Sequence, residues 1–432
     1  MTSGDIQQAS RPRLRAHAGH LFFLANFVLA KGAVYLTPLV LAAIAGAQLY
    51  GGIELALAIG LQACAILLGA PLAGIMQVYL IKRDSAVGDL LWWLTFVSSV
   101  ALLLLIGLLW LAGAGAATVL TASVLFATVI QNTASTWYRI RGERNRTAWA
   151  DSASILIAGI VVIGVVAVFG TGATGTAGLI FTALTGLTAL VSAAVLLRHK
   201  ATDLRGRLGR ATRIGLPMMV AGMFSIWLGV GGRILIGITS PADLAAYSLA
   251  FRIAGLALGV HQLATTAAFP RLYATRTRQA DRLLAMFMAA VLAVTVILAL
   301  AGPFVVDLFR FSALGPQDRE TFRALVPLTS LQTYFWIGYA LLLFRINRSG
   351  AAKASIVPVL IVTIAGIGII LLVARFISND ARLICGLIAL HSIAYFAMAW
   401  LVLARRRLPH RYIGLLGIAG GLILGAIAAL SL

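Results

Sequence analysis

The feature that most constrains this chain is a series of apolar runs, each about 20 residues long, that recurs from end to end. A helix of that length crosses roughly 30 Å of hydrocarbon. Because 61% of the residues are hydrophobic and only 11% are charged, the chain lacks the polar surface of a water-soluble domain. The sequence predicts an all-α integral membrane protein with about 13 spans. The expected spans are 21–45, 53–81, 89–112, 116–137, 152–169, 174–197, 214–238, 243–269, 283–306, 324–344, 355–377, 382–404 and 412–432.

The basic residues indicate how these spans are oriented. The formal net charge is +21, and about 26 of the 34 Lys and Arg lie on alternate connections, such as RHKATDLRGRLGRATR at 198–213. Such a positive-inside pattern places the N-terminus of this multi-pass protein in the cytoplasm. Since membrane orientation accounts for the charge, no nucleic-acid partner is expected.

The connections are too short to hold a catalytic domain. The longest polar one, 198–213, has about 16 residues. GTGATG at 170–175 fits a dinucleotide-binding glycine pattern, but it joins two apolar helices instead of following a strand, so it predicts a hairpin turn. Cys64 and Cys385 lie inside apolar spans, where each acts as a small hydrophobe. We therefore expect no enzyme activity, no metal site and no cofactor.

A weak internal repeat suggests two lobes. IELALAI at 53–59 lies about 194 residues before YSLAFRI at 247–253, and both helices follow a short outer connection. Two consecutive six-helix units would give these helices the same orientation. Such parallel repeats characterise transporters that rock two lobes about a central site. The expected parts are a cytoplasmic arm at 1–20, an N-terminal six-helix lobe at 21–197, a basic linker at 198–213, a C-terminal six-helix lobe at 214–404, and a basic loop with an extra span at 405–432.

Two segments resemble a known family. LYGGIELALAIGLQACAILLGAPLAGI at 49–75 and GLPMMVAGMFSIWLGVGGRILIGITSPADLAAYSLAFRIAGL at 215–256 are similar to the polysaccharide and O-antigen flippases of the multidrug/oligosaccharidyl-lipid/polysaccharide exporter superfamily. The resemblance implies a V-shaped pair of lobes in the bacterial inner membrane that moves an undecaprenyl-pyrophosphate-linked glycan between leaflets by alternating access. It also implies glycan biosynthesis machinery as a partner. In many members an acidic residue precedes the arginine that aligns with Arg233. Here that position is Gly232, which removes a counter-ion.

Three basic residues lie within the expected spans and need an explanation: Lys31, Arg233 and Arg252. A cation at the centre of a membrane helix costs roughly 2.5 to 3.5 kcal/mol on insertion scales. The only carboxylate clearly within a span is Glu54, so internal pairing does not neutralise all three. A positive cavity selects an anion, and pyrophosphate offers the acceptor oxygens that Arg and Lys hold well. We therefore expect these three residues to bind substrate; the alternative for each is a cation that is partnered or reaches the headgroups.

Other polar residues inside the spans are candidates for coupling transport to a cation. They are Glu54, His261 and His391. A histidine can carry protons in a coupled transporter, and a carboxylate can bind and release a cation. The alternatives are a neutral histidine hydrogen-bonded between helices and a carboxylate exposed to water at the interface.

The last expected span carries a small-residue pattern. Gly417, Gly421 and Gly425 form consecutive GxxxG steps on one face, which lets helix backbones approach closely in lipid. We expect this helix to pack against the body of the protein. Self-association is the alternative.

Three classes of function fit this sequence to different degrees. The favoured one is a flippase for a lipid-linked anionic glycan, with membrane lipid as the other partner. The second is a small-molecule antiporter of the same superfamily, although a positive cavity repels organic cations. The third is a membrane glycosyltransferase or polymerase, which usually needs a large outer loop or an acidic cluster that this sequence lacks.

Overall fold

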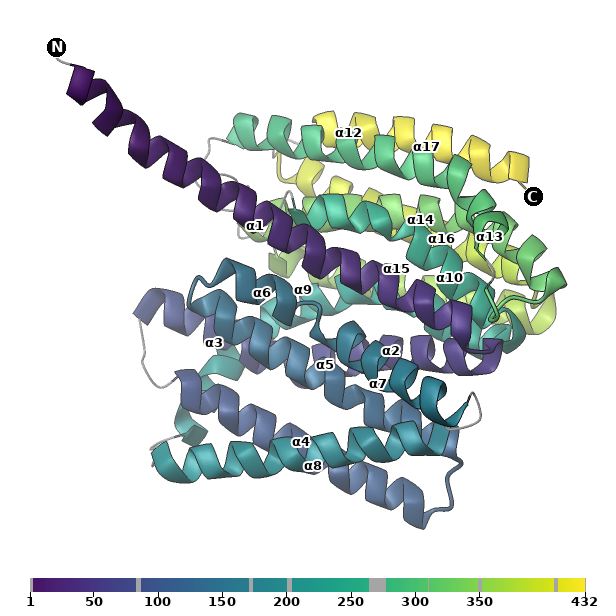
Figure 1. Cartoon of the computed structure of the whole chain (residues 1–432). Coiled ribbons are helices and arrows are strands. Elements are labelled where there is room, and N and C mark those ends of the chain that lie inside the picture. The colour runs from purple at the N-terminus through teal and green to yellow at the C-terminus, as the bar shows by residue number, and fades with distance from the viewer. Residues whose placement is uncertain are drawn as a thin grey trace.

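A computed structural model of the chain describes residues 3–82, 87–170, 174–199, 204–263, 277–309, 311–348, 352–407 and 411–431. Within these ranges the chain is all-helical (Figure 1). Ten helices are long and apolar enough to cross a membrane, or 11 if the bent pair α6 and α7 forms one span. The prediction of an all-α integral membrane protein is therefore confirmed. The membrane orientation, the bacterial inner membrane and the division into lobes stay predictions.

Helices lie in each of the 13 expected spans, with different boundaries, and residues 264–269 of the 243–269 span lie outside the described residues. The helices are α1 (Ser3–Ile44), α2 (Ala47–Leu67), α3 (Gly69–Lys82), α4 (Val87–Leu111), α5 (Ala116–Ile140), α6 (Arg144–Ala150), α7 (Ala153–Phe169), α8 (Thr174–His199), α9 (Leu204–Thr239), α10 (Leu244–Ala254), α12 (Thr277–Ala301), α13 (Val305–Leu308), α14 (Pro316–Arg348), α15 (Ala352–Phe376), α16 (Ala381–Arg405) and α17 (Arg411–Ser431), with short 3-10 turns η1 (Pro241–Asp243) and η2 (Gly302–Phe304). Two expected spans are interrupted. The 53–81 helix breaks at Leu68, and the 243–269 helix breaks at Gly255, after which residues 256–263 are helical again.

Two of the expected spans, 116–137 and 324–344, are helical but are not among the apolar candidates for crossing a membrane. These are α5 and α14, and both carry polar side chains that point inward. Thr128, Thr133 and Ser135 of α5 are buried, as are Thr329 and Gln332 of α14. Several of these hydroxyl groups donate to the carbonyl four residues earlier in the same helix, so they are satisfied without water. Low hydropathy here reflects an interior position in the bundle.

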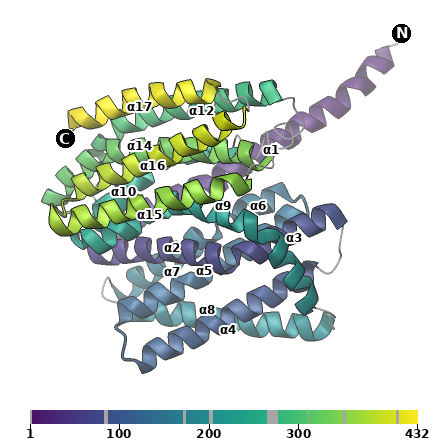
Figure 2. The ribbon, with the colours of Figure 1, turned by 180° about the vertical axis from the view of Figure 1, so that it is seen from behind.

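The helices form two groups that meet along α2, α9 and α10. One group contains α2 to α8, with α4 beside α8 at one edge, and the other contains α10 and α12 to α17, with α12 beside α17 at the opposite edge (Figures 1 and 2). Helix α1 crosses the face of the molecule, where it packs on α6 and α7 and also touches α10. Helix α9 joins the groups, because it packs on α2 and α3 as well as on α14, α15 and α16.

Glycines allow α9 to lie directly against α3. A Cβ atom at Gly215 would overlap the backbone of Ala70, and one at Gly74 would overlap the backbone of Ala211. Close approach of two backbones at small residues is the usual basis of tight helix packing in lipid. The contact therefore depends on glycine at both positions.

The last helix packs against the body, as expected, although its contact face differs from the predicted one. A Cβ atom at Gly417 would overlap Phe396, and one at Gly421 would lie 3.1 Å from Phe335. Gly420, outside the predicted pattern, faces Tyr334, whose hydroxyl donates to the Leu416 carbonyl at 2.6 Å. By contrast, nothing lies within 4 Å of a Cβ at Gly425.

Candidate functional site

The candidate site is a buried cluster of three charged residues, Glu54 of α2, Arg233 of α9 and Arg252 of α10, hereafter the Glu54 cluster. Arg252 contacts the carboxylate through two nitrogens, with Nε 2.9 Å from Oε1 and Nη2 2.9 Å from Oε2. Arg233 donates from Nη1 to Oε2 at 2.7 Å. Glu54 is 1% exposed and Arg233 is 4% exposed. The carboxylate thus lies between two guanidinium groups in a nearly water-free interior.

The helix boundaries explain why these residues meet. Helix α2 begins at Ala47, earlier than expected, so Glu54 lies two turns inside it and not at the interface. Arg233 lies in the last two turns of α9, and the short turn η1 reverses the chain into α10, where Arg252 lies two turns further along. The two arginines therefore come from neighbouring helices of one hairpin and meet a carboxylate 179 and 198 residues earlier in the sequence.

The arginines are held by further contacts. Arg233 Nη2 donates to the Gly229 carbonyl at 3.1 Å, and its guanidinium carbon lies 5.2 Å from the centre of the Phe251 ring, a cation–π distance. Phe251 in turn stacks on Trp336 at 6.1 Å. Arg233 Nε, however, is buried without a hydrogen-bond acceptor in the part of the chain that the structure describes.

Hydrogen-bond capacity in the cluster is unbalanced. Two guanidinium groups supply about ten N–H donors, while a carboxylate accepts about four hydrogen bonds. Two positive charges and one negative charge also leave the cluster with a formal charge of +1. Such an excess of donors and of positive charge favours an additional anion.

Tyrosines surround the cluster. Tyr247 donates to Gln332 Oε1 at 2.8 Å, and Gln332 Nε2 donates to the Leu228 carbonyl at 3.2 Å. Tyr35 of α1 lies against Gly259, where a Cβ atom would be 3.5 Å from its ring, and it is an electrostatic neighbour of Arg252. This close packing at Gly259 brings α1 to the edge of the cluster.

The position before Arg233 has a packing explanation. A Cβ atom at Gly232 would overlap the hydroxyl of Tyr247. An acidic side chain therefore cannot occupy this position unless Tyr247 moves. The loss of a counter-ion from α9 is offset by Glu54 of α2, so Arg233 and Arg252 are both partnered cations, and their binding of substrate stays a prediction.

Lys31 lies in a different environment from the two arginines. It is 8% exposed, and the charged groups that act on it are Asp151 and Arg139. No ion pair or hydrogen bond joins its ammonium to any other described residue. Lys31 and Tyr35 are four residues apart on α1 and so lie on one helix face. That face places Lys31 about one turn from the tyrosine beside Arg252.

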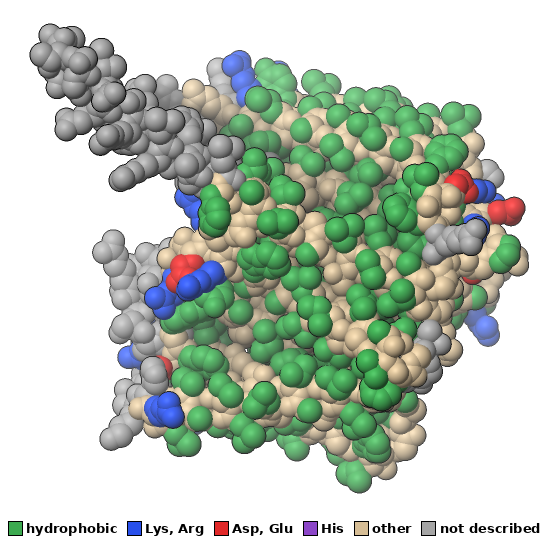
Figure 3. Space-filling view, in the orientation of Figure 1, with side chains coloured by type: hydrophobic (Ala, Val, Ile, Leu, Met, Phe, Trp, Pro, Cys, Tyr) green, Lys and Arg blue, Asp and Glu red, His purple; other side chains and the backbone are tan. Residues whose placement is uncertain are grey.

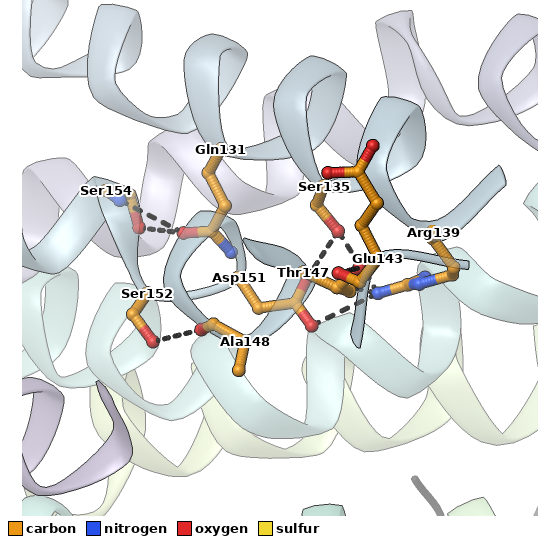
Figure 4. A network of polar contacts seen from close by, with 9 residues as sticks. All are labelled: Gln131, Ser135, Arg139, Glu143, Thr147, Ala148, Asp151, Ser152 and Ser154. Carbon is orange, nitrogen blue, oxygen red and sulfur yellow. Dashed lines mark hydrogen bonds and ion pairs between the residues drawn. The ribbon is translucent and has the colours of Figure 1, made fainter. Parts of the chain in front are cut away.

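A polar network surrounds the bend between α6 and α7 and includes Asp151, the carboxylate that acts on Lys31 (Figure 4). The two helices meet at 48°, and Asp151 lies at the bend. Its carboxylate accepts hydrogen bonds from Arg139 Nη2 at 3.0 and 3.2 Å and a short one from Ser135, both in α5. On the α7 side, the Ser154 amide and hydroxyl donate to Gln131 of α5. The bend is thus fixed to α5 on both sides.

The two histidines lie elsewhere. His391 of α16 is buried against Tyr395, with the ring centres 4.9 Å apart, and a Cβ atom at Gly366 would overlap its ring. Its Nε2 has no hydrogen-bond partner among the described residues. His261 lies in the helical residues 256–263, within the candidate span Pro241–Leu263. The described part of the chain contains no group of three or more His, Cys, Asp and Glu that could hold a metal ion.

The fold is similar to that of solved MATE structures. One similar solved structure is described as the inward-facing conformation of a multidrug resistance MATE family transporter of the MOP superfamily, with 16% identity over 88% of this chain and 95% of that chain and a TM-score of 0.50. A crystal structure of a MATE mutant is similar at 18% identity over 89% and 95%, also with a TM-score of 0.50. No protein-family profile and no curated protein matches the sequence. The chain therefore shares the fold of these structures, and its apolar helices are those of a multi-pass membrane protein.

Several residues of the site escaped the sequence analysis. Asp151 looked like part of a connection, because a bend inside a span leaves no hydropathy signal. Tyr50, one turn before Glu54, and Tyr247 looked like ordinary apolar positions, although both are fully buried beside the cluster. The sequence signal that could have identified Tyr50 and Tyr247 is a tyrosine within an apolar span near a charged residue, since a phenol inside a helix bundle needs a polar partner.

Proposed function

We propose that this protein is an alternating-access transporter for a small organic anion and that the Glu54 cluster is its cargo site. The observation that carries the proposal is that the cluster joins the two helix groups: Glu54 belongs to α2, and both arginines belong to the α9–α10 hairpin. Helix groups that separate during a transport cycle would divide these charges. Arg233 and Arg252 would then remain as two neighbouring positive charges that have lost the Glu54 carboxylate.

An anionic cargo would restore the balance. Leaving a buried charge without its partner costs roughly 3 to 5 kcal/mol, so an open state of the cluster needs another anion beside Arg233 and Arg252. A carboxylate or phosphate group of the cargo would take the place of Glu54 in the paired geometry that guanidinium groups favour. Lys31 would provide a second contact along α1, since its ammonium has no ion pair among the described residues.

Cation coupling follows from the same step. When the arginines leave, Glu54 is a carboxylate without counter-charge, and binding a proton or a metal cation would neutralise it. Glu54 is therefore our candidate for the coupling residue. His261 and His391 remain weaker candidates, since the contacts of His391 are aromatic and steric.

The second candidate is a flippase for a lipid-linked glycan. It is favoured by the formal charge of +1 on the cluster and by the additional buried cation Lys31, because a pyrophosphate carries several acceptor oxygens. A small-molecule cargo is preferred because the similar solved structures include a multidrug transporter. Either cargo would use the same arginines.

Reconstituted liposomes distinguish the two candidates. The protein is expected to exchange a small labelled carboxylate or phosphate ester, with flux at least tenfold lower in Arg252→Gln, since a charge-assisted hydrogen bond contributes about 1.5 to 3 kcal/mol. Arg146→Gln is the matched control, because Arg146 pairs with Glu143 on the surface and is 69% exposed. Translocation of a lipid-linked oligosaccharide without small-anion flux would favour the flippase. If Arg252→Gln lowered neither the small-anion flux nor the translocation of a lipid-linked oligosaccharide, the cluster would be refuted as a cargo site.

A further inference from the structure

A second site lies at the edge of the molecule, and none of the residues of the Glu54 cluster lines it. A cleft of about 390 Å³ opens where the C-terminal ends of α12 and α17 meet the first turns of α14 and α16. This volume is within the range of small-ligand sites. The ends of α12 and α17 that line the cleft lie on the side of the molecule where the chain ends and where α13 is located (Figure 1).

The lining of the cleft is divided by polarity. One part is apolar and includes Leu300, Phe304 and Ile427; Leu300 is 55% exposed and Phe304 is 63% exposed. The other part carries Glu320, Arg323 and Arg382. In Figure 3, acidic and basic side chains gather at two opposite edges of this face, one of them the edge where the chain ends, and the surface between them is largely hydrophobic. A cleft that is apolar on one side and charged on the other fits an amphiphile at a membrane boundary.

One of the charged residues that line the cleft is already in an ion pair. Arg323 pairs with Asp307 at 2.5 Å, in a contact where both side chains are nearly half exposed. Arg382 and Glu320 have no ion pair with another described residue, although the carboxylate of Asp243 acts on Arg382 at longer range. Arg382 and Glu320 therefore line the same cleft without an ion pair to another described residue.

We infer that this cleft binds the headgroup of a zwitterionic aminophospholipid from the surrounding bilayer. The phosphate would accept hydrogen bonds from Arg382, the ammonium would pair with Glu320, and the acyl chains would follow Leu300, Phe304 and Ile427. Glu320 and Asp307 disfavour a lipid with net negative charge, because the formal charges of Glu320, Asp307, Arg323 and Arg382 sum to zero. The exposed apolar residues of α12 and η2 disfavour a water-soluble ligand. The inference does not depend on the identity of the transported cargo.

Native mass spectrometry of the delipidated full chain tests this inference with two lipids, phosphatidylethanolamine and phosphatidylglycerol. The protein is expected to retain one phosphatidylethanolamine at lipid concentrations where phosphatidylglycerol is lost. Arg382→Gln and Glu320→Gln should each weaken phosphatidylethanolamine binding about tenfold. Arg405→Gln, at the opposite end of α16, is the matched control and should bind as the unaltered protein does.

A second measurement locates the lipid. A phosphatidylethanolamine that carries a photoreactive group in its acyl chain should crosslink to α12 or α17 near Leu300 and Ile427, and this crosslink should weaken in Arg382→Gln. Equal retention of phosphatidylglycerol, unchanged binding in both variants, or crosslinks confined to other helices would each overturn the inference.

Discussion

Replacing Glu54 with glutamine tests the Glu54 cluster most directly. The variant keeps the shape of the side chain but removes the only negative charge among the described residues that pairs with Arg233 and Arg252, whose side chains are 5% and 10% exposed. Removing one partner of a buried ion pair costs roughly 3 to 5 kcal/mol, because the other charge stays without compensation. Three hydrogen bonds from two guanidinium groups converge on this carboxylate, so we expect the upper part of that range.

The assay is reversible unfolding of the purified protein in mixed micelles, with the free energy of unfolding taken from the denaturant midpoint and slope. Asp307→Asn is the matched control, since its pair with Arg323 is exposed and should contribute less than about 1 kcal/mol. Replacing all three cluster residues with leucine or methionine should restore most of the loss, since apolar replacement of a buried ionic group is often neutral or stabilising. A loss below about 1 kcal/mol in Glu54→Gln would refute the reasoning that the cluster is buried and interdependent.

Three further variants test neighbouring parts of the structure. Gly232→Ala should destabilise the protein by about 1 to 3 kcal/mol in thermal unfolding, because its methyl group would meet the Tyr247 hydroxyl, and adding Tyr247→Phe should recover part of that loss. Lys31→Met should leave the melting temperature unchanged or raise it while lowering anion flux in liposomes; a drop in both would indicate a structural role. Asp151→Asn should lower stability by about 1 kcal/mol through its bonds to Ser135 and Arg139, measured against Glu143→Gln.

The membrane class of this protein was readable from its sequence. The thickness of the hydrocarbon layer sets a helix length of about 20 residues, and backbone groups in lipid must pair within their own helix. Both constraints act locally along the chain, so hydropathy located the helices even where polar residues, as in α5 and α14, lowered it. Hydropathy located the helix boundaries less well. Helix α2 begins at Ala47, earlier than expected, so Glu54 lies in the interior and not at the interface.

Only the tertiary structure decided which charges are paired. The sequence identified Arg233, Arg252 and Glu54 as unusual because ionised groups in a membrane interior are costly wherever they lie. It could not show that the carboxylate accepts hydrogen bonds from both arginines, since the partners are 179 and 198 residues apart. The same holds for Gly232, whose role follows from the Tyr247 hydroxyl packed against it. Hydropathy along the chain predicts which residues lie inside the membrane. Which of these residues pair depends on how separate helices are placed against each other.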